Sequence, residues 1–176
     1  MNDRAACDPF GVPSTPHALE LSHVVKRYGE ITAVNGLDLV VPNGGCVGLL
    51  GPNGAGKSTT MRMLTAQTIA DEGQITVLGH ELPGDSKAAR ARMGVVPQLD
   101  NLDTTLTVEQ NLVVFSHLYR VPKARRKAAI ERVLKIANLG ERRDSKVDEL
   151  SGGMRRRLLI GRALIHQPQL VLLDEP

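Results

Sequence analysis

The sequence is poor in cysteine and in aromatic residues, and it has no long apolar run. Its two cysteines, Cys7 and Cys46, form no metal-binding spacing, and neither suggests a disulfide framework, so a reducing compartment is favoured. No apolar run approaches the ~20 residues that a membrane-spanning helix needs. The first residues, with Asp3, Arg4 and Asp8, also lack the apolar segment of a secretory signal. We therefore expect a cytoplasmic or peripheral protein.

Chain length and net charge further restrict the class of protein. The 176 residues carry a net charge of +3, with 41% hydrophobic and 23% charged residues. These proportions are ordinary for a globular protein, and the length suits one sizeable core, with or without a smaller lobe. This small positive charge does not by itself indicate binding to nucleic acid, and no nucleic-acid partner is expected.

A glycine-rich stretch carries the strongest chemical signal in the chain. It has the P-loop pattern G-x-x-x-x-G-K-S, and it reads Gly51, Pro52, Asn53, Gly54, Ala55, Gly56, Lys57, Ser58. The apolar run Cys46–Leu50 before it predicts a buried parallel strand, and Thr59–Ala66 after it predicts a helix. Strand, glycine-rich turn and helix are the context that this motif requires.

The residue types in this stretch suit a nucleoside triphosphate. Glycines let successive backbone N–H groups point inward, and the following helix presents free N–H groups to the same anion. Lys57 supplies a mobile charge for the β- and γ-phosphates, and Ser58 supplies an oxygen for Mg²⁺. A purely structural glycine-rich turn is the alternative, which the flanking segments disfavour.

The region before this loop predicts a tail followed by two strands. Residues 1–17 contain three prolines and little apolar periodicity, which indicates a flexible tail. Residues 18–28 and 31–41 have strand-like patterns. Tyr28, one of four aromatic residues, has a flat ring that suits stacking on adenine. A half-exposed strand residue is an equally good interpretation of Tyr28.

Two further strands are predicted between the loop and the middle of the chain. Gln74–Leu78 is one, and the other is an apolar run that starts at Met93 and ends at Gln98. Ligands of open α/β sheets bind beyond the carboxyl ends of strands, so Gln98 is a candidate for contact with the nucleotide or its metal. An ordinary strand-to-loop residue remains the alternative.

A helical lobe is predicted at about residues 99–160. Thr107 and Gln110 have the spacing of a capping box, and apolar residues then recur on one helix face at Val108, Leu112, Phe115 and Tyr119. A second helix is expected from Pro122 to Asn138, with Gly140 past its end. The basic cluster 123–127 at its start opposes the helix dipole; a solvated face is the favoured interpretation, and contact with a partner or acidic lipid is the alternative.

A second candidate phosphate site begins the next helix. Ser151 is a good N-cap, and Gly152 and Gly153 leave the N-terminus of that helix open to a ligand. Because the P-loop already serves one nucleotide, a second donor surface suggests a nucleotide shared between two copies. A plain helix start is the alternative. The arginines at 155–157 are expected to face solvent, with contact to an anionic partner as the alternative.

The last residues predict a buried strand that ends in charge. Leu170–Leu173 is apolar, and Asp174 and Glu175 follow. Asp174 is suited to hold Mg²⁺ through its hydration shell, and Glu175 to polarise a water for attack on the γ-phosphate. An exposed acidic strand end is the disfavoured alternative.

In this order, these motifs resemble the ATP-binding subunit of an ABC transporter over residues 18–176. The resemblance implies an α/β P-loop fold with an N-terminal antiparallel β part and an inserted helical lobe. It implies that Tyr28 stacks on adenine, that Gly51–Thr59 form the Walker A loop with Lys57 in a catalytic role, and that Gln98 senses Mg²⁺. It also implies that Ser151–Gly153 close on the partner's ATP, and that Asp174 and Glu175 are the metal-binding and water-activating pair.

Within that family the sequence resembles exporters of the drug-resistance and nodulation-factor type. GPNGAGKSTTMRML and LSGGMRRRLLIGRALI carry the likeness, with Met154 where glutamine is usual. Family members continue past Asp-Glu-Pro into a loop at the dimer interface, another strand and a histidine. We therefore expect a domain that is partial at its C-terminus and hydrolyses ATP poorly alone.

The resemblance implies an ATPase subunit that powers export through a separate membrane subunit. ATP and Mg²⁺ are the expected ligands, a second ATPase subunit and a membrane permease the expected partners, and the cytoplasmic membrane face the expected location. A non-catalytic nucleotide-binding fragment and a soluble ATPase of the same superfamily are the alternatives. The second would need a paired cassette or a large coiled-coil insertion.

Overall fold

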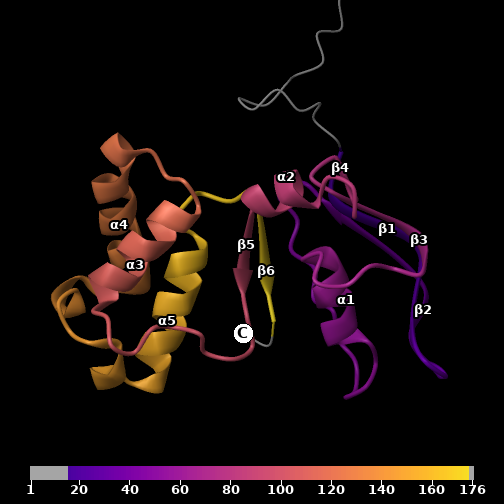
Figure 1. The fold of residues 1–176 in the computed structure, drawn as a ribbon, viewed down its shortest axis with the longest axis horizontal. Coiled ribbons are helices and arrows are strands. Elements are labelled where there is room, and N and C mark those ends of the chain that lie inside the picture. The colour runs from indigo at the N-terminus through magenta and orange to yellow at the C-terminus, as the bar shows by residue number, and fades with distance from the viewer. Residues whose placement is uncertain (1–15, 175–176) are drawn as a thin grey trace, which may run out of the picture. The chain divides into compact units, whose positions relative to one another are not determined.

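The computed structural model describes residues 16–174, and the chain falls into two compact units, residues 1–92 and 93–176 (Figure 1). The elements of the first unit are β1 (His17–Tyr28), β2 (Ile31–Pro42), α1 (Lys57–Leu64), β3 (Glu72–Val77), β4 (His80–Leu82) and α2 (Ser86–Ala91). Those of the second are β5 (Met93–Val96), α3 (Val108–Leu118), α4 (Lys123–Ala137), the 3₁₀ turns η1 (Gly140–Arg142) and η2 (Val147–Glu149), α5 (Gly152–Ala163) and β6 (Leu170–Leu173).

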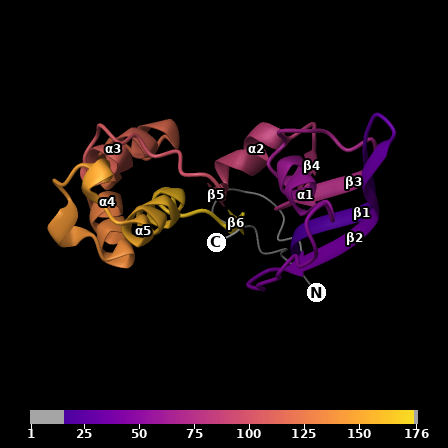
Figure 2. The same cartoon turned by 90° about the horizontal axis from the view of Figure 1, so that it is seen from below.

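The first unit is built on an antiparallel sheet with strand order β2-β1-β3-β4 (Figure 2). β1 and β2 form a hairpin whose turn includes Gly29, at φ +57°. Along β1, Leu19 and Leu21 are buried while Glu20 between them is exposed, as expected where one sheet face covers a core. The strands predicted on either side of Gly29 and at residues 74–78 are confirmed, with ends shifted by one or two residues.

The strand predicted before the P-loop does not form. Residues 46–50 have no regular structure, Cys46 is exposed, and the side chain of Leu50 is 92% exposed. A parallel strand is held by hydrogen bonds to neighbouring strands, and no strand among residues 16–174 pairs with this segment. The prediction of a buried strand, and of a buried Cys46, is therefore wrong for this structure. Cys7 lies outside the described residues.

The second unit contains a parallel pair of strands and three helices. β5 and β6 pair in register, with Met93 opposite Leu170 and Val96 opposite Leu173. Gly94 lets α5 approach β5, because a Cβ at this position would lie 2.5 Å from the Ala163 carbonyl oxygen. The strands predicted at the two ends of this unit are confirmed, and the structure shows that they pair with each other.

β6 is less buried than its apolar sequence predicts. Leu172 is buried, whereas Val171 is 37% and Leu173 is 44% exposed. Among the strands described, β6 pairs with β5 alone, so one edge of β6 has no hydrogen-bonded neighbour in this part of the chain. A strand covered on both sides would bury such a run completely.

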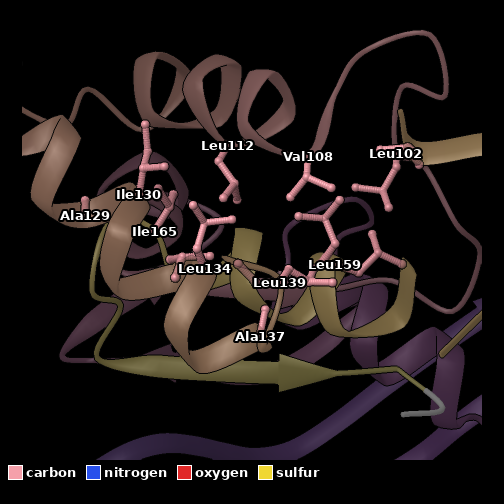
Figure 3. Packing of buried hydrophobic residues seen from close by; sticks show 14 of the residues in the cluster. Leu102, Val108, Leu112, Ala129, Ile130, Leu134, Ala137, Leu139, Leu159 and Ile165 are labelled. Carbon is pink, nitrogen blue, oxygen red and sulfur yellow. The ribbon is translucent and has the colours of Figure 1, made fainter. Parts of the chain in front are cut away.

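The helices of the second unit enclose one apolar core. Figure 3 shows Val108 and Leu112 of α3 directed toward Leu134 of α4 and Leu159 of α5, and all four are buried. The predicted capping box starts α3: the Thr107 hydroxyl accepts from the Gln110 N–H, and the Gln110 side chain accepts from the Thr107 N–H. This core fixes where α5 begins, and therefore where Ser151 lies.

The second helix of the unit ends slightly earlier than predicted. α4 ends at Ala137, one residue before the predicted end, and Asn138 takes the left-handed conformation, at φ +53°. Asparagine tolerates this conformation better than most residues, so it serves as the cap. None of the helices between residues 16 and 174 combines the length and apolar character that a bilayer crossing requires.

Candidate functional site

The glycine-rich loop leads directly into α1, as its pattern predicts. Gly54 and Gly56 have φ +84° and +86°, which side-chain-bearing residues rarely adopt. A Cβ at Gly56 would also lie 2.3 Å from the Ala33 carbonyl oxygen of β2, so only glycine fits there. Nothing lies within 4 Å of a Cβ position at Gly54, so the loop surface is open at that residue.

Lys57, the first residue of α1, is held over the loop that precedes it. Its Nζ donates to the Gly51 carbonyl oxygen at 2.7 Å and to the Pro52 carbonyl oxygen at 2.8 Å. An ammonium has three N–H donors, so these two bonds position the charge and leave a donor for an anion. Ser58 and Thr59 follow in the first turn, where helical N–H groups lack intrahelical partners. This set of donors fits a phosphate.

A hollow of about 480 Å³ adjoins the loop within the first unit. One side is β2 and the other is the loop with its flanks. Its lining comprises Thr32, Ala33, Val34, Asn35, Gly36, Leu37, Asp38, Leu49, Leu50, Gly54, Ala55, Lys57 and Thr60. The hollow borders Lys57, and part of its apolar wall comes from the segment predicted as a strand.

Tyr28 is the last residue of β1, and its side chain is 45% exposed. The Lys26 ammonium lies 5.4 Å from the centre of the ring. The exposed ring is compatible both with stacking on a base and with a half-exposed strand residue. Its adenine-stacking role stays a prediction.

Gln98 and Asp174 follow the two parallel strands of the second unit. Gln98 comes two residues after β5 and is exposed, and Asp174 comes one residue after β6 and is half-buried. The Asp174 N–H donates to the Val96 carbonyl oxygen at 3.0 Å, so the pairing of the strands extends to Asp174. The structure therefore places these two residues, which are 76 apart in sequence, at the same end of β5 and β6.

Ser151 caps α5 as predicted, since its hydroxyl accepts from the Met154 N–H at 3.3 Å. Ser151, Gly152 and Gly153 are all exposed, so this helix start is accessible to a ligand. The P-loop and Tyr28 belong to residues 1–92, whereas Gln98, Asp174 and residues 151–153 belong to residues 93–176.

The residues predicted to bind metal and to activate water lie only partly within the described part of the chain. Glu175, the predicted water-activating residue, lies outside residues 16–174. Within that range no three or more His, Cys, Asp or Glu side chains gather as a metal site. Magnesium bound with phosphates needs only one or two protein ligands, so the magnesium-binding roles of Ser58 and Asp174 stay predictions.

The sequence-based interpretation missed Arg156. It was expected to face solvent with Arg155 and Arg157, but it is half-buried and donates to the main-chain carbonyl oxygens of Pro97, which precedes Gln98, and of Asp174. The helical spacing did not single it out, because Arg155 lies three residues before the buried Leu158 just as Arg156 lies three residues before the buried Leu159.

Comparison with known proteins agrees with this geometry. Residues 34–176 match the family model described as "ABC transporter". The chain is 49% identical over 159 residues to the Nod factor export ATP-binding protein I of Rhizobium meliloti strain 1021, covering 90% of this chain and 48% of that protein. It is 47% identical over 166 residues to the protein of the same name from Ralstonia nicotianae, covering 94% and 51%. The chain thus spans about half the length of these relatives.

Solved structures show the same fold. An ATP-binding subunit of an ABC transporter matches with a TM-score of 0.81 at 28% identity, covering 90% of this chain and 66% of that one. The ATP-binding cassette MJ0796, described as a dimer bound to ADP and phosphate, matches with a TM-score of 0.76 at 29% identity, covering 90% and 74%. The predicted fold class, an α/β P-loop fold with an N-terminal antiparallel sheet, is confirmed. This chain belongs to the ABC transporter family and has the fold of the family's ATP-binding subunits.

Proposed function

We propose that this chain binds ATP with Mg²⁺ and, paired with a second ATP-binding subunit, hydrolyses it to power export through a separate membrane subunit. The observation that carries the proposal is the loop itself, with Gly56 packed against β2 and Lys57 held over Gly51 and Pro52. Backbone N–H groups at the start of α1 and the Lys57 ammonium together bind a polyphosphate.

Each remaining residue has a proposed role around that nucleotide. Tyr28 stacks on the adenine, and Ser58, Gln98 and Asp174 serve the Mg²⁺, which neutralises charge on the phosphates during transfer. Glu175 orients the attacking water. Ser151–Gly153, exposed at the start of α5, bind the nucleotide held by the other subunit.

The relatives support the assignment to export. Two of them are named as ATP-binding proteins of Nod factor export, and a solved relative is described as dimeric. Because the present chain spans about half of the named exporters' length, the cargo, the membrane partner and a position at the cytoplasmic membrane face are all part of the proposal.

The first test is binding of a fluorescent ATP analogue to the chain and to Lys57→Ala. Lys57→Ala should bind the analogue with an affinity lower by roughly ten- to a hundredfold, because it loses a charge-assisted contact to phosphate. Lys87→Ala, which removes an exposed lysine of α2 in the same unit, is the matched control and should bind normally. Equal affinity of Lys57→Ala and Lys87→Ala would contradict the proposal.

A further inference from the structure

One arginine of α5 joins the ends of both parallel strands. Nη1 of Arg156 donates to the Pro97 carbonyl oxygen at 2.8 Å, and Nη2 donates to the Asp174 carbonyl oxygen at 3.3 Å. Pro97 follows β5 and Asp174 follows β6. The guanidinium therefore spans the end of the strand pair, with one nitrogen for each strand.

The two carbonyl oxygens belong to peptide units that matter for the site. The Pro97 carbonyl is part of the peptide bond to Gln98, so the bond from Arg156 fixes the plane of the peptide from which Gln98 starts. The main chain of Asp174 is held on both sides, because its N–H donates to the Val96 carbonyl oxygen and its carbonyl accepts from Arg156.

The same helix also holds the chain that follows Gln98. The side chain of Arg162, only 3% exposed, donates to the main-chain and side-chain oxygens of Asn101. Arg155 lies 3.9 Å from a carboxylate oxygen of Asp100. Gln98 is exposed between these attachments, so its backbone is anchored to α5 before and after it.

The chemistry of the side chain suits this role. A guanidinium is planar and always charged, and its nitrogens can donate to two acceptors at once in a fixed geometry. A lysine has the charge without the fork. A charge-assisted bond to each carbonyl is stronger than a neutral one, which favours a well-defined position for both strand ends.

We propose that Arg156 is a positioning residue that fixes Gln98 and Asp174 relative to each other and to α5. The inference rests on the proposed function, in which Gln98 and Asp174 serve the magnesium of bound ATP. Arg156 touches neither nucleotide nor metal in this role. It couples the metal-binding pair to the helix that begins with Ser151, so that both move as one body.

The test compares Arg156→Gln with Arg157→Gln in the 176-residue chain. Arg157 is a matched control, because it lies on the same helix and its Nε also donates to a main-chain carbonyl, that of Ala137, at 2.9 Å and away from the strand ends. Hydrogen exchange is measured without nucleotide. In Arg156→Gln the Asp174 amide should exchange about tenfold faster, as expected for loss of a charge-assisted bond beside it.

The second measurement is ATP-analogue binding as a function of Mg²⁺ concentration. Arg156→Gln should need about tenfold more Mg²⁺ than the unaltered chain for half-maximal enhancement of ATP-analogue binding. Its affinity for the metal-free analogue should stay within about twofold of that of the unaltered chain. Arg157→Gln should match the unaltered chain in both measurements. Arg156→Lys should recover only part of the loss, because it restores the charge and not the fork.

The possible outcomes distinguish failure of this inference from failure of the proposed function on which it rests. An unaltered chain that binds no ATP would overturn the proposed function and the metal-site role together. Normal ATP binding with the same Mg²⁺ dependence and the same Asp174 exchange in Arg156→Gln as in Arg157→Gln would overturn the role of Arg156 alone. Full recovery by Arg156→Lys would overturn the requirement for a two-pronged donor.

Discussion

Gly54 and Gly56 share a left-handed backbone but differ in their surroundings. Both have φ near +85°, and only Gly56 packs against β2. The sequence pattern identifies both as loop glycines, because their spacing from Lys57 is that of the P-loop. It does not reveal that Ala33 makes one position far less tolerant than the other.

Alanine substitutions at the two glycines separate backbone strain from steric conflict. Gly54→Ala should lose about 1–2 kcal/mol of the free energy of unfolding, because the left-handed conformation costs that much with a Cβ. Gly56→Ala should lose clearly more, since its Cβ would lie 2.3 Å from the Ala33 oxygen. Urea unfolding of both variants measures the difference. Equal losses would show that contact with β2 does not constrain the loop.

For Arg156 and Leu50, the burial predicted from the sequence was wrong. The local sequence patterns predicted a solvated Arg156 and a buried Leu50, whereas the structure has a half-buried Arg156 and a Leu50 that is 92% exposed. In both cases the environment depends on segments distant in sequence. No local signal distinguished Arg156 from the neighbouring arginines, and none marked Leu50 as exposed.

At the level of elements, local signals worked best where a helix begins. Thr107 and Ser151 were predicted as caps, and each hydroxyl accepts the expected backbone N–H. Strand prediction succeeded where alternation was clear, as in β1, and failed for residues 46–50. Caps depend on neighbours within four residues, whereas a strand depends on partners that can lie anywhere in the chain.

The capping box of α3 gives a direct test at this scale. Thr107→Ala removes the acceptor of the Gln110 N–H and should lower the free energy of unfolding by about 0.5–2 kcal/mol. Thr104→Ala, at an exposed position in the preceding turn, is the control and should change it by less than about 0.5 kcal/mol. Chemical denaturation of both variants provides the measurement. A loss in Thr104→Ala as large as in Thr107→Ala would argue against the cap.

At the scale of the whole molecule, the proposed donors lie in different compact units. The P-loop is in residues 1–92, and the exposed helix start at Ser151–Gly153 is in residues 93–176. Family membership and the fold are established, whereas the roles of these residues in turnover stay predictions. The predicted boundary of the helical lobe, at about residues 99–160, is likewise untested.

Pairing of two chains around ATP is the prediction that belongs to this scale. Glu175→Gln should form an ATP-dependent dimer that lasts longer than that of the unaltered chain, because slower hydrolysis delays release. Light scattering during size-exclusion chromatography measures the assembly. Adding Lys57→Ala should abolish it by removing the nucleotide. Equal dimer lifetimes with and without Glu175→Gln would contradict turnover-driven release and favour a non-catalytic nucleotide-binding module.

The sequence alone determined the features that depend on near neighbours: the P-loop, the caps of α3 and α5, the strand patterns on either side of Gly29 and the family resemblance. Tertiary structure alone decided which strands pair, that Asp174 lies beside Val96, and that Arg156 joins the two strand ends. The physical reason is the separation along the chain between the residues that determine each feature. Backbone conformation and capping bonds are set within a few residues, whereas burial and strand pairing depend on contacts between segments far apart in the chain.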